Sequence, residues 1–180
     1  MLLLYMWITS QIIGFAGLAM ALLAYQAHKK VQTLVLFGVA FAFVAVSLAF
    51  LSDWPVVALN VVASVRSFTF AFVEHKGIQG KRLSLALMLT FMAVAIISVS
   101  LLWQWWLDWV LLGASVFIVF GNWAKGPHLI RVSSAIYDGL VIINYVVIFN
   151  IIGIVQSVLL LGSVAIFYIR FFARREMKAS

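Results

Sequence analysis

The chain has no cysteine and very little charge. Without cysteine it can form neither a disulfide bond nor a thiolate metal site. Charged residues make up 9% of its 180 residues, and hydrophobic residues make up 66%. An ordinary soluble domain carries about 25% charged residues and about 45–50% apolar ones. The composition therefore excludes a soluble domain, which has too little interior for this many apolar side chains, and predicts an integral membrane protein.

Acidic residues are the scarcest of the charged residues. Five Asp and Glu stand against twelve Lys and Arg, so the formal net charge is +7. The basic residues fall in short clusters between apolar runs, which is the pattern of the positive-inside rule in membrane proteins. We therefore expect contacts with membrane lipids and no nucleic-acid partner.

Long apolar runs fill most of the chain. A helix needs about 20 mostly apolar residues to cross a bilayer. Seven runs meet this criterion, at residues 4–27, 32–52, 54–74, 82–103, 106–124, 128–149 and 151–172. The N-terminal run lacks a basic segment and an A-x-A cleavage site, so it is interpreted as a retained span rather than a signal peptide. The predicted fold is an all-α membrane protein with seven transmembrane helices.

The positions of the charges predict the orientation of these helices. Asp53 and Asp108 lie in or near the loops on one side, and tryptophans cluster at that boundary. The basic clusters all fall on the other side: Lys29 and Lys30; Lys76, Lys81 and Arg82; Lys125 and Arg131; and Arg174, Arg175 and Lys178. Because basic loops stay in the cytoplasm, the N-terminus is expected outside and the C-terminus inside. For a bacterial protein this means the inner membrane.

An internal repeat divides the chain. A shift of 96 residues lays the first three spans over the last three without a gap. The shift pairs scarce residues, namely Gly17 with Gly113, Gln26 with Asn122, Lys29 with Lys125, Asn60 with Gln156, and Ser67 with Ser163. We predict two parallel three-helix bundles at residues 1–76 and 106–180, joined by a linker helix within residues 77–105, in a 3+1+3 arrangement.

This organisation resembles the SWEET / PQ-loop superfamily, which includes the PnuC-type vitamin transporters and the KDEL receptor. Within it, the stretch DWPVVALNVVASVR and the series formed by Lys125, Gly126, Arg131, Asn144 and Tyr145 are similar to the YgjV-like bacterial inner-membrane proteins. The resemblance implies passage of a small polar solute between the two bundles.

The Pro-Gln pair that names the PQ-loop proteins is absent. Tyr25-Gln26 and Gly121-Asn122 stand in its places. The resemblance thus makes Gln26 and Asn122 candidates for a gate.

One base and one acid stand well inside the predicted spans. Arg66 lies about eight residues, or roughly 12 Å, from the cytoplasmic end of its span, and Asp138 lies about ten residues, or roughly 15 Å, from the same side. Charged residues inside a membrane usually face the protein interior and pair. We expect Arg66 and Asp138 to form an ion pair or to share a hydrated cavity, as a gate or coupling element. The alternative is that Arg66 extends to the headgroups and Asp138 bonds to a neighbouring backbone.

Three amides form a second polar layer near the outer surface, at Asn60, Asn144 and Gln156. Amides donate and accept hydrogen bonds, which suits an uncharged polar solute. In SWEET-like transporters, repeat-related asparagines line the substrate pocket, and Asn60 matches that role. Tyr137 and Tyr145 share one helix face and could stack a planar ring. Hydrogen bonding between helices and plain packing are the alternatives.

The chain shows no metal or catalytic signature. His28, His75 and His128 have no second ligand at helical spacing, and HExxH, nucleophile-elbow and phosphate-loop motifs are absent. We expect no cofactor and no enzymatic activity. The hypothesis is a facilitator or proton-coupled carrier of a small polar metabolite such as a sugar, nucleoside or vitamin precursor, acting as a monomer or homo-oligomer. Anion transport through Arg66 is a variant, and a non-transporting receptor or assembly factor is the alternative.

Overall fold

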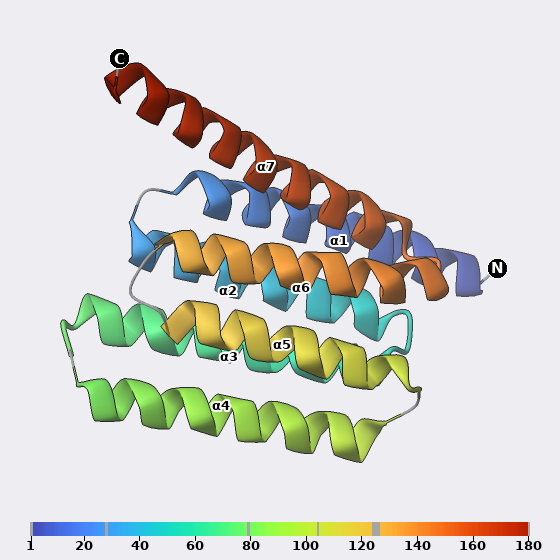
Figure 1. The fold of residues 1–180 in the computed structure, drawn as a ribbon. Coiled ribbons are helices and arrows are strands. Elements are labelled where there is room, and N and C mark those ends of the chain that lie inside the picture. The colour runs from blue at the N-terminus through green and yellow to red at the C-terminus, as the bar shows by residue number, and fades with distance from the viewer. Residues whose placement is uncertain (1, 28, 79, 104, 124–126, 180) are drawn as a thin grey trace.

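The structure is a computed structural model that describes residues 2–27, 29–78, 80–103, 105–123 and 127–179. The described residues form seven helices joined by short connections (Figure 1). The helices are α1 (Leu2–Gln26), α2 (Lys30–Ala49), α3 (Trp54–His75), α4 (Lys81–Leu102), α5 (Leu107–Trp123), α6 (Pro127–Val147) and α7 (Ile151–Ala179). The predicted all-α fold with seven helices is confirmed.

Five of the helices, α1, α2, α3, α4 and α7, are long and apolar enough to cross a membrane. The described parts of α5 and α6 contain shorter apolar stretches, Leu107–Gly121 and Val132–Val147. Large apolar side chains cover the outer faces of the helices, including Phe15, Ile97 and Ile169. Such a surface suits a hydrocarbon solvent, in which only structures that satisfy all of their backbone hydrogen bonds internally are stable.

The helices pack as two groups of three with α4 at one edge. In the first group α2 lies between α1 and α3, and in the second α6 lies between α5 and α7. The groups meet where α1 packs against α7 and where α3 packs against α5. Helix α4 contacts α3 and α5, and Figure 1 shows it at the bottom of the assembly. The part of the protein interior that lies outside each group is enclosed between the two groups.

Small polar residues connect helices inside the first group. The Ser47 hydroxyl donates to the backbone carbonyl of Ser10 over 2.8 Å, which links α2 to α1. The Ser64 hydroxyl donates to the carbonyl of Gly38 over 2.8 Å, which links α3 to α2. Hydrogen bonds of this kind contribute modestly to helix association in membranes and fix how neighbouring helices are rotated.

Equivalent features of the two groups stand 97 residues apart, one more than the predicted shift of 96. Helices α3 and α7 begin at Trp54 and Ile151, and the turns before them contain the positive-φ residues Ser52 and Phe149. A parallel repeat also makes the α1–α7 contact equivalent to the α5–α3 contact, and both are present. The two-bundle repeat stays a prediction. These equivalences support it with a separation of 97 residues between the two groups.

The two ends of the helix assembly differ in character. The end where α1 finishes and α2 begins carries Lys29, Lys30, Lys76 and Arg82, and we call it the basic end. The opposite end, where α3 begins, we call the tryptophan end. It carries exposed tryptophans at positions 54, 103, 105, 106 and 109. The predicted orientation places the basic end in the cytoplasm and stays a prediction.

Candidate functional site

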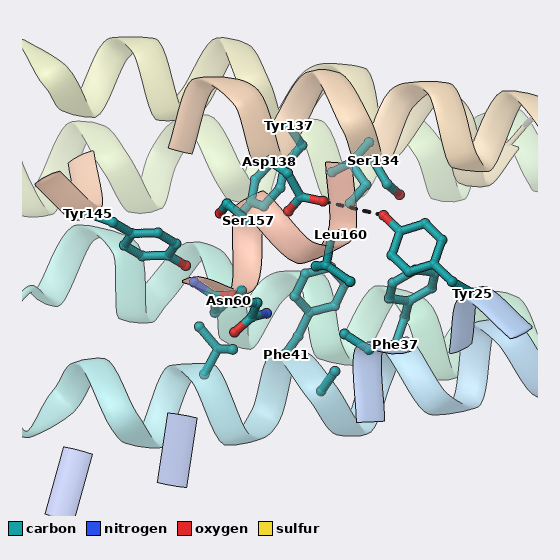
Figure 2. A pocket seen from close by; sticks show the side chains of 15 residues that line it. Tyr25, Phe37, Phe41, Asn60, Ser134, Tyr137, Asp138, Tyr145, Ser157 and Leu160 are labelled. Carbon is teal, nitrogen blue, oxygen red and sulfur yellow. Dashed lines mark hydrogen bonds between the residues drawn. The ribbon is translucent and has the colours of Figure 1, made fainter. Parts of the chain in front are cut away.

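A small polar cavity lies between the two helix groups (Figure 2). Six helices contribute to its lining, and α4 does not. Its volume is about 20 Å³, which is room for one water molecule because a water needs roughly 10–15 Å³ by this measure. The cavity therefore has room for a group of about the size of a water molecule.

The second helix group supplies most of the polar wall. Ser134, Tyr137 and Asp138 lie on one face of α6 because residues three and four apart are neighbours on a helix. Gln156 and Ser157 of α7 extend this wall. Figure 2 shows the Asp138 carboxyl group between Tyr25 and Ser157. A carboxyl group, hydroxyl groups and an amide therefore meet in one buried space.

The first helix group supplies a wall that is largely apolar. Phe37, Phe41 and Val44 come from α2, and Ala21 and Tyr25 come from α1. Asn60 of α3 adds a polar side chain, and its amide nitrogen donates to the carbonyl of Val56 over 2.8 Å. The cavity thus has an aromatic side and a polar side.

The two walls are built on equivalent positions of the two groups. At a separation of 97 residues, five pairs of lining residues coincide: Ala21 with Ile118, Phe37 with Ser134, Ala40 with Tyr137, Phe41 with Asp138, and Asn60 with Ser157. Equivalent helix faces therefore line the cavity, but their side chains differ in polarity. The sequence shift of 96 had paired Asn60 with Gln156 instead.

One hydrogen bond crosses the cavity between the helix groups. The Tyr25 hydroxyl of α1 donates to Oδ2 of Asp138 on α6 over 3.3 Å (Figure 2). Asp138 is 9% exposed and Tyr25 is 8% exposed. Tyr25 stands one residue before the end of α1, so this bond ties the basic end of the first group to the middle of α6.

The predicted ion pair between Arg66 and Asp138 does not form. Arg66 is 1% exposed, and its Nε and Nη2 atoms have no hydrogen-bond partner among the described residues. It is absent from the lining of the cavity, whereas Asp138 turns toward Tyr25. Equal depth along two helices does not bring two side chains together, because the rotation of each helix decides which neighbour a residue faces. The headgroup alternative is also wrong for Arg66, because its guanidinium is buried.

The predicted amide layer is divided by the structure. Asn60 and Gln156 line the cavity. Asn144 does not, and its amide nitrogen donates to Oδ2 of Asp53 over 3.1 Å. This bond links the turn between α2 and α3 to α6 at the tryptophan end. Burial raises the pKa of Asp53 above its ordinary value, and the hydrogen bond from Asn144 offsets part of that rise.

A second contact between the helix groups lies near the same end. The backbone N–H of Ile152, at the start of α7, donates to Oε1 of Gln11 on α1 over 3.0 Å. An orphan donor of a helix N-terminus is thereby satisfied by a side chain of the other group. The tryptophan end is therefore fastened at two places.

The other residues predicted for the site have different outcomes. Tyr137 and Tyr145 line the cavity, as a shared helix face predicts. Gln26 is exposed at the end of α1, and it lies outside the described lining. The side chain of Asn122 lies outside the described residues. Gating by Gln26 and Asn122 stays a prediction.

Sequence reasoning missed the aromatic wall and two hydroxyl groups. Phe37 and Phe41 carry no distinguishing signal in a chain with 15 phenylalanines. A separation of 97 residues makes Ser157 equivalent to Asn60, which is a signal for Ser157, whereas Ser134 is equivalent to Phe37 and has no such signal. At the same separation of 97 residues, Tyr25 is equivalent to Asn122 in the sequence. Among the described residues, no group of three His, Asp or Glu side chains is arranged to hold a metal ion.

Most of the chain matches a known protein family. Residues 8–175 match the Imp-YgjV family, which is described as a bacterial inner membrane protein. The chain matches no curated protein and no solved structure. The family therefore covers nearly the whole chain.

Proposed function

Because the chain belongs to the Imp-YgjV family of bacterial inner membrane proteins, we propose that it transports a small polar solute between its two helix groups. The observation that carries this proposal is the polar cavity between the two groups, which both groups line. Polar side chains are expensive inside a membrane, and they usually face a solute pathway or a binding site there. A purely structural assembly of seven helices has no need for such a cavity.

The contacts between the groups supply a physical basis for movement. The Tyr25–Asp138 hydrogen bond joins them toward the basic end, and the Asp53–Asn144 bond joins them at the tryptophan end. A space of about 20 Å³ is too small for a metabolite, so the groups must separate to admit one. Opening one set of contacts while the other stays closed is alternating access by rocking of two repeats.

Asp138 is the candidate coupling group of this transporter. It is the one ionisable carboxyl group among the described lining residues, so a coupling proton would bind there. The positive-inside rule supports a cytoplasmic position for the basic end in this proposal. The SWEET / PQ-loop resemblance, a monomer or homo-oligomer as the working unit, and the lack of enzymatic activity and cofactor belong to the same proposal.

Solute counterflow in liposomes tests transport directly. Purified protein is reconstituted, and radiolabelled sugars, nucleosides, vitamin precursors and amines are offered in exchange for the same unlabelled compound. Accumulation above protein-free liposomes is expected for at least one compound, with strong loss in Ser157→Leu, which fills the cavity. The control is Ser100→Leu, on the exposed face of α4.

The opposite result has a defined meaning. A compound that binds the protein in detergent but never accumulates in liposomes would contradict transport. It would favour the non-transporting receptor on the same helical scaffold. Loss of accumulation in Ser100→Leu as well would show that the assay reports folding rather than the cavity.

A further inference from the structure

Four aromatic rings form a continuous series along the cavity. The ring centroids of Tyr25 and Phe37 are 5.2 Å apart, those of Phe37 and Phe41 are 6.0 Å apart, and those of Phe41 and Tyr137 are 6.4 Å apart. The first and third pairs are near perpendicular, at 87°. Perpendicular neighbours make corners instead of a flat stack. All four rings belong to the lining, so they partly enclose its space (Figure 2).

A single acid stands beside this series. Asp138 is the one carboxyl group among the described lining residues, and none of them is a lysine or arginine. Its neighbour Tyr137 and its hydrogen-bond donor Tyr25 are the two ends of the aromatic series. The carboxyl group and the four rings therefore border the same space.

This combination favours a positive ligand. The face of an aromatic ring carries partial negative charge and attracts a cation that lies within about 6 Å of the ring centroid. A carboxylate adds direct attraction, which is strong where water is excluded. An anion meets repulsion from both. Arg66, the group on which anion transport would depend, lies outside the lining.

We propose that the cavity is a binding site for a small organic cation, either a protonated amine or a quaternary ammonium. The ammonium group would sit against Asp138, and its alkyl substituents would contact Phe37 and Phe41. Phe41 and Asp138 occupy equivalent positions of the two helix groups, 97 residues apart, but one side chain is apolar and the other is acidic. This difference fits the ligand, because it supplies one apolar and one anionic partner. This inference rests on the proposed function and names the class of its substrate.

The size of the cavity sets a condition on binding. A space of about 20 Å³ holds a water-sized group, so a methylated ammonium must push the helix groups apart when it enters. Separation of α1 from α6 requires the Tyr25–Asp138 bond to break. The cation then takes the place of the tyrosine hydroxyl beside the carboxylate.

Binding of matched charged and uncharged probes tests the inference. Methylammonium, tetramethylammonium and choline are titrated into the full-length protein in detergent and followed by calorimetry. The uncharged control is 3,3-dimethylbutan-1-ol, in which carbon replaces the choline nitrogen. At least one cation is expected to bind tenfold or more tightly than the uncharged analogue. Equal affinity for choline and its analogue, or no binding by any of the three cations, would overturn the inference.

Substitutions then locate the site. Asp138→Asn is expected to weaken cation binding at least tenfold, and Phe41→Leu is expected to weaken it by a smaller factor because it keeps an apolar side chain but removes the ring. The control is Phe72→Leu, since Phe72 is an exposed phenylalanine on α3 that does not line the cavity. Phe41→Leu keeps the inference testable if Asp138→Asn fails to fold. Unchanged cation affinity in a folded Phe41→Leu protein would overturn the aromatic part of the site.

The same probes separate this inference from transport. Cation binding without cation exchange in liposomes would retain the site and contradict transport. Exchange of a neutral or anionic compound by a protein that binds no cation would retain transport and overturn the cation site.

Discussion

The Tyr25 hydroxyl and the Asp138 carboxyl group join α1 to α6 by a 3.3 Å hydrogen bond, across the cavity that separates the two helix groups. It is one of the contacts between the first group and the polar wall of the second, beside the Phe41–Tyr137 ring contact. The positions of these two residues differ by 113 in the chain, so helix packing alone brings them together.

The first prediction concerns the removal of this hydrogen bond. Tyr25→Phe keeps the ring and its contact with Phe37 but loses the donor. We expect a decrease in the free energy of unfolding of about 0.5–1.5 kcal/mol, the usual net contribution of one hydrogen bond. Thermal unfolding in detergent measures it, with Tyr5→Phe as the control because Tyr5 is 65% exposed. Equal melting temperatures for all three proteins would contradict the contribution of this bond.

Arg66 leads to a prediction of the opposite sign. Its guanidinium is buried, and two of its nitrogen atoms find no hydrogen-bond partner in the part of the chain that the structure describes. Each unsatisfied buried donor costs about 1–3 kcal/mol. Arg66→Met keeps much of the side-chain volume and removes the charge, so we expect a higher melting temperature. The matched control is Arg82→Met, because Arg82 is exposed at the start of α4. Destabilisation by Arg66→Met alone would mean that another group neutralises the arginine in the membrane.

Much of the helical fold could be predicted from hydrophobic run length. The predicted spans begin and end within a few residues of α1 to α6, because apolar length and polar loops determine where a helix can cross. Helix α7 continues to Ala179, beyond the predicted end at residue 172. The basic residues in that segment ended the apolar run, but lysine and arginine are good helix formers and do not end a helix.

The cavity could be predicted only in part. In an apolar chain, Asp138, Asn60 and Gln156 stand out, and all three line the space. Depth alone predicts that Asn144 belongs to the same layer, but the rotation of α6 turns it toward Asp53. Depth follows from counting residues, whereas rotation depends on side-chain packing between helices. The aromatic wall was hidden for a related reason, because phenylalanines on lipid-facing and cavity-facing positions look alike in the sequence.

A pH-dependent prediction follows from Asp53. Burial raises its pKa in the folded protein, so the folded state holds this proton more tightly than the unfolded state does. Its contribution to stability is therefore fully present below the ordinary value of about 3.9 and is lost as the pH rises through the higher folded value. Asp53→Asn removes the titration. As the pH is raised from 4 to 7, we expect the melting temperature of Asp53→Asn to rise relative to that of the wild-type protein.

The partner of Asp53 provides the control for that series. Asn144→Leu removes the hydrogen bond that lowers the pKa of Asp53, so the loss of stability toward pH 7 should become larger than in the wild-type protein. A difference between Asp53→Asn and wild type that stays constant over this pH range would contradict the assignment.

Two glycines of α7 give a matched pair of substitutions. A Cβ atom at Gly153 would lie 2.7 Å from ring atoms of Tyr145, a residue of the cavity lining. Gly153→Ala should therefore cost about 1–3 kcal/mol of stability, as overpacking does, and should disturb the cavity. At Gly162 no atom of the described residues lies within 4 Å of such a Cβ atom. Gly162→Ala should be neutral or should stabilise the helix by about 0.5–1 kcal/mol. Equal unfolding curves for the two variants would show that α6 and α7 are not closely packed at Gly153.

The orientation of the helices can be measured because the chain has no cysteine of its own. Gly80→Cys and Trp106→Cys place single thiols at exposed positions on opposite ends of α4. With the basic end in the cytoplasm, a membrane-impermeant maleimide should label the cysteine at position 106 in intact cells. It should label the one at position 80 only after the inner membrane is permeabilised. The reverse pattern would invert the predicted orientation. Labelling of both cysteines from the same side would show that α4 does not cross the membrane. A continuous helix of 22 residues is about 33 Å long, so a helix that crosses the membrane has its two ends on opposite sides.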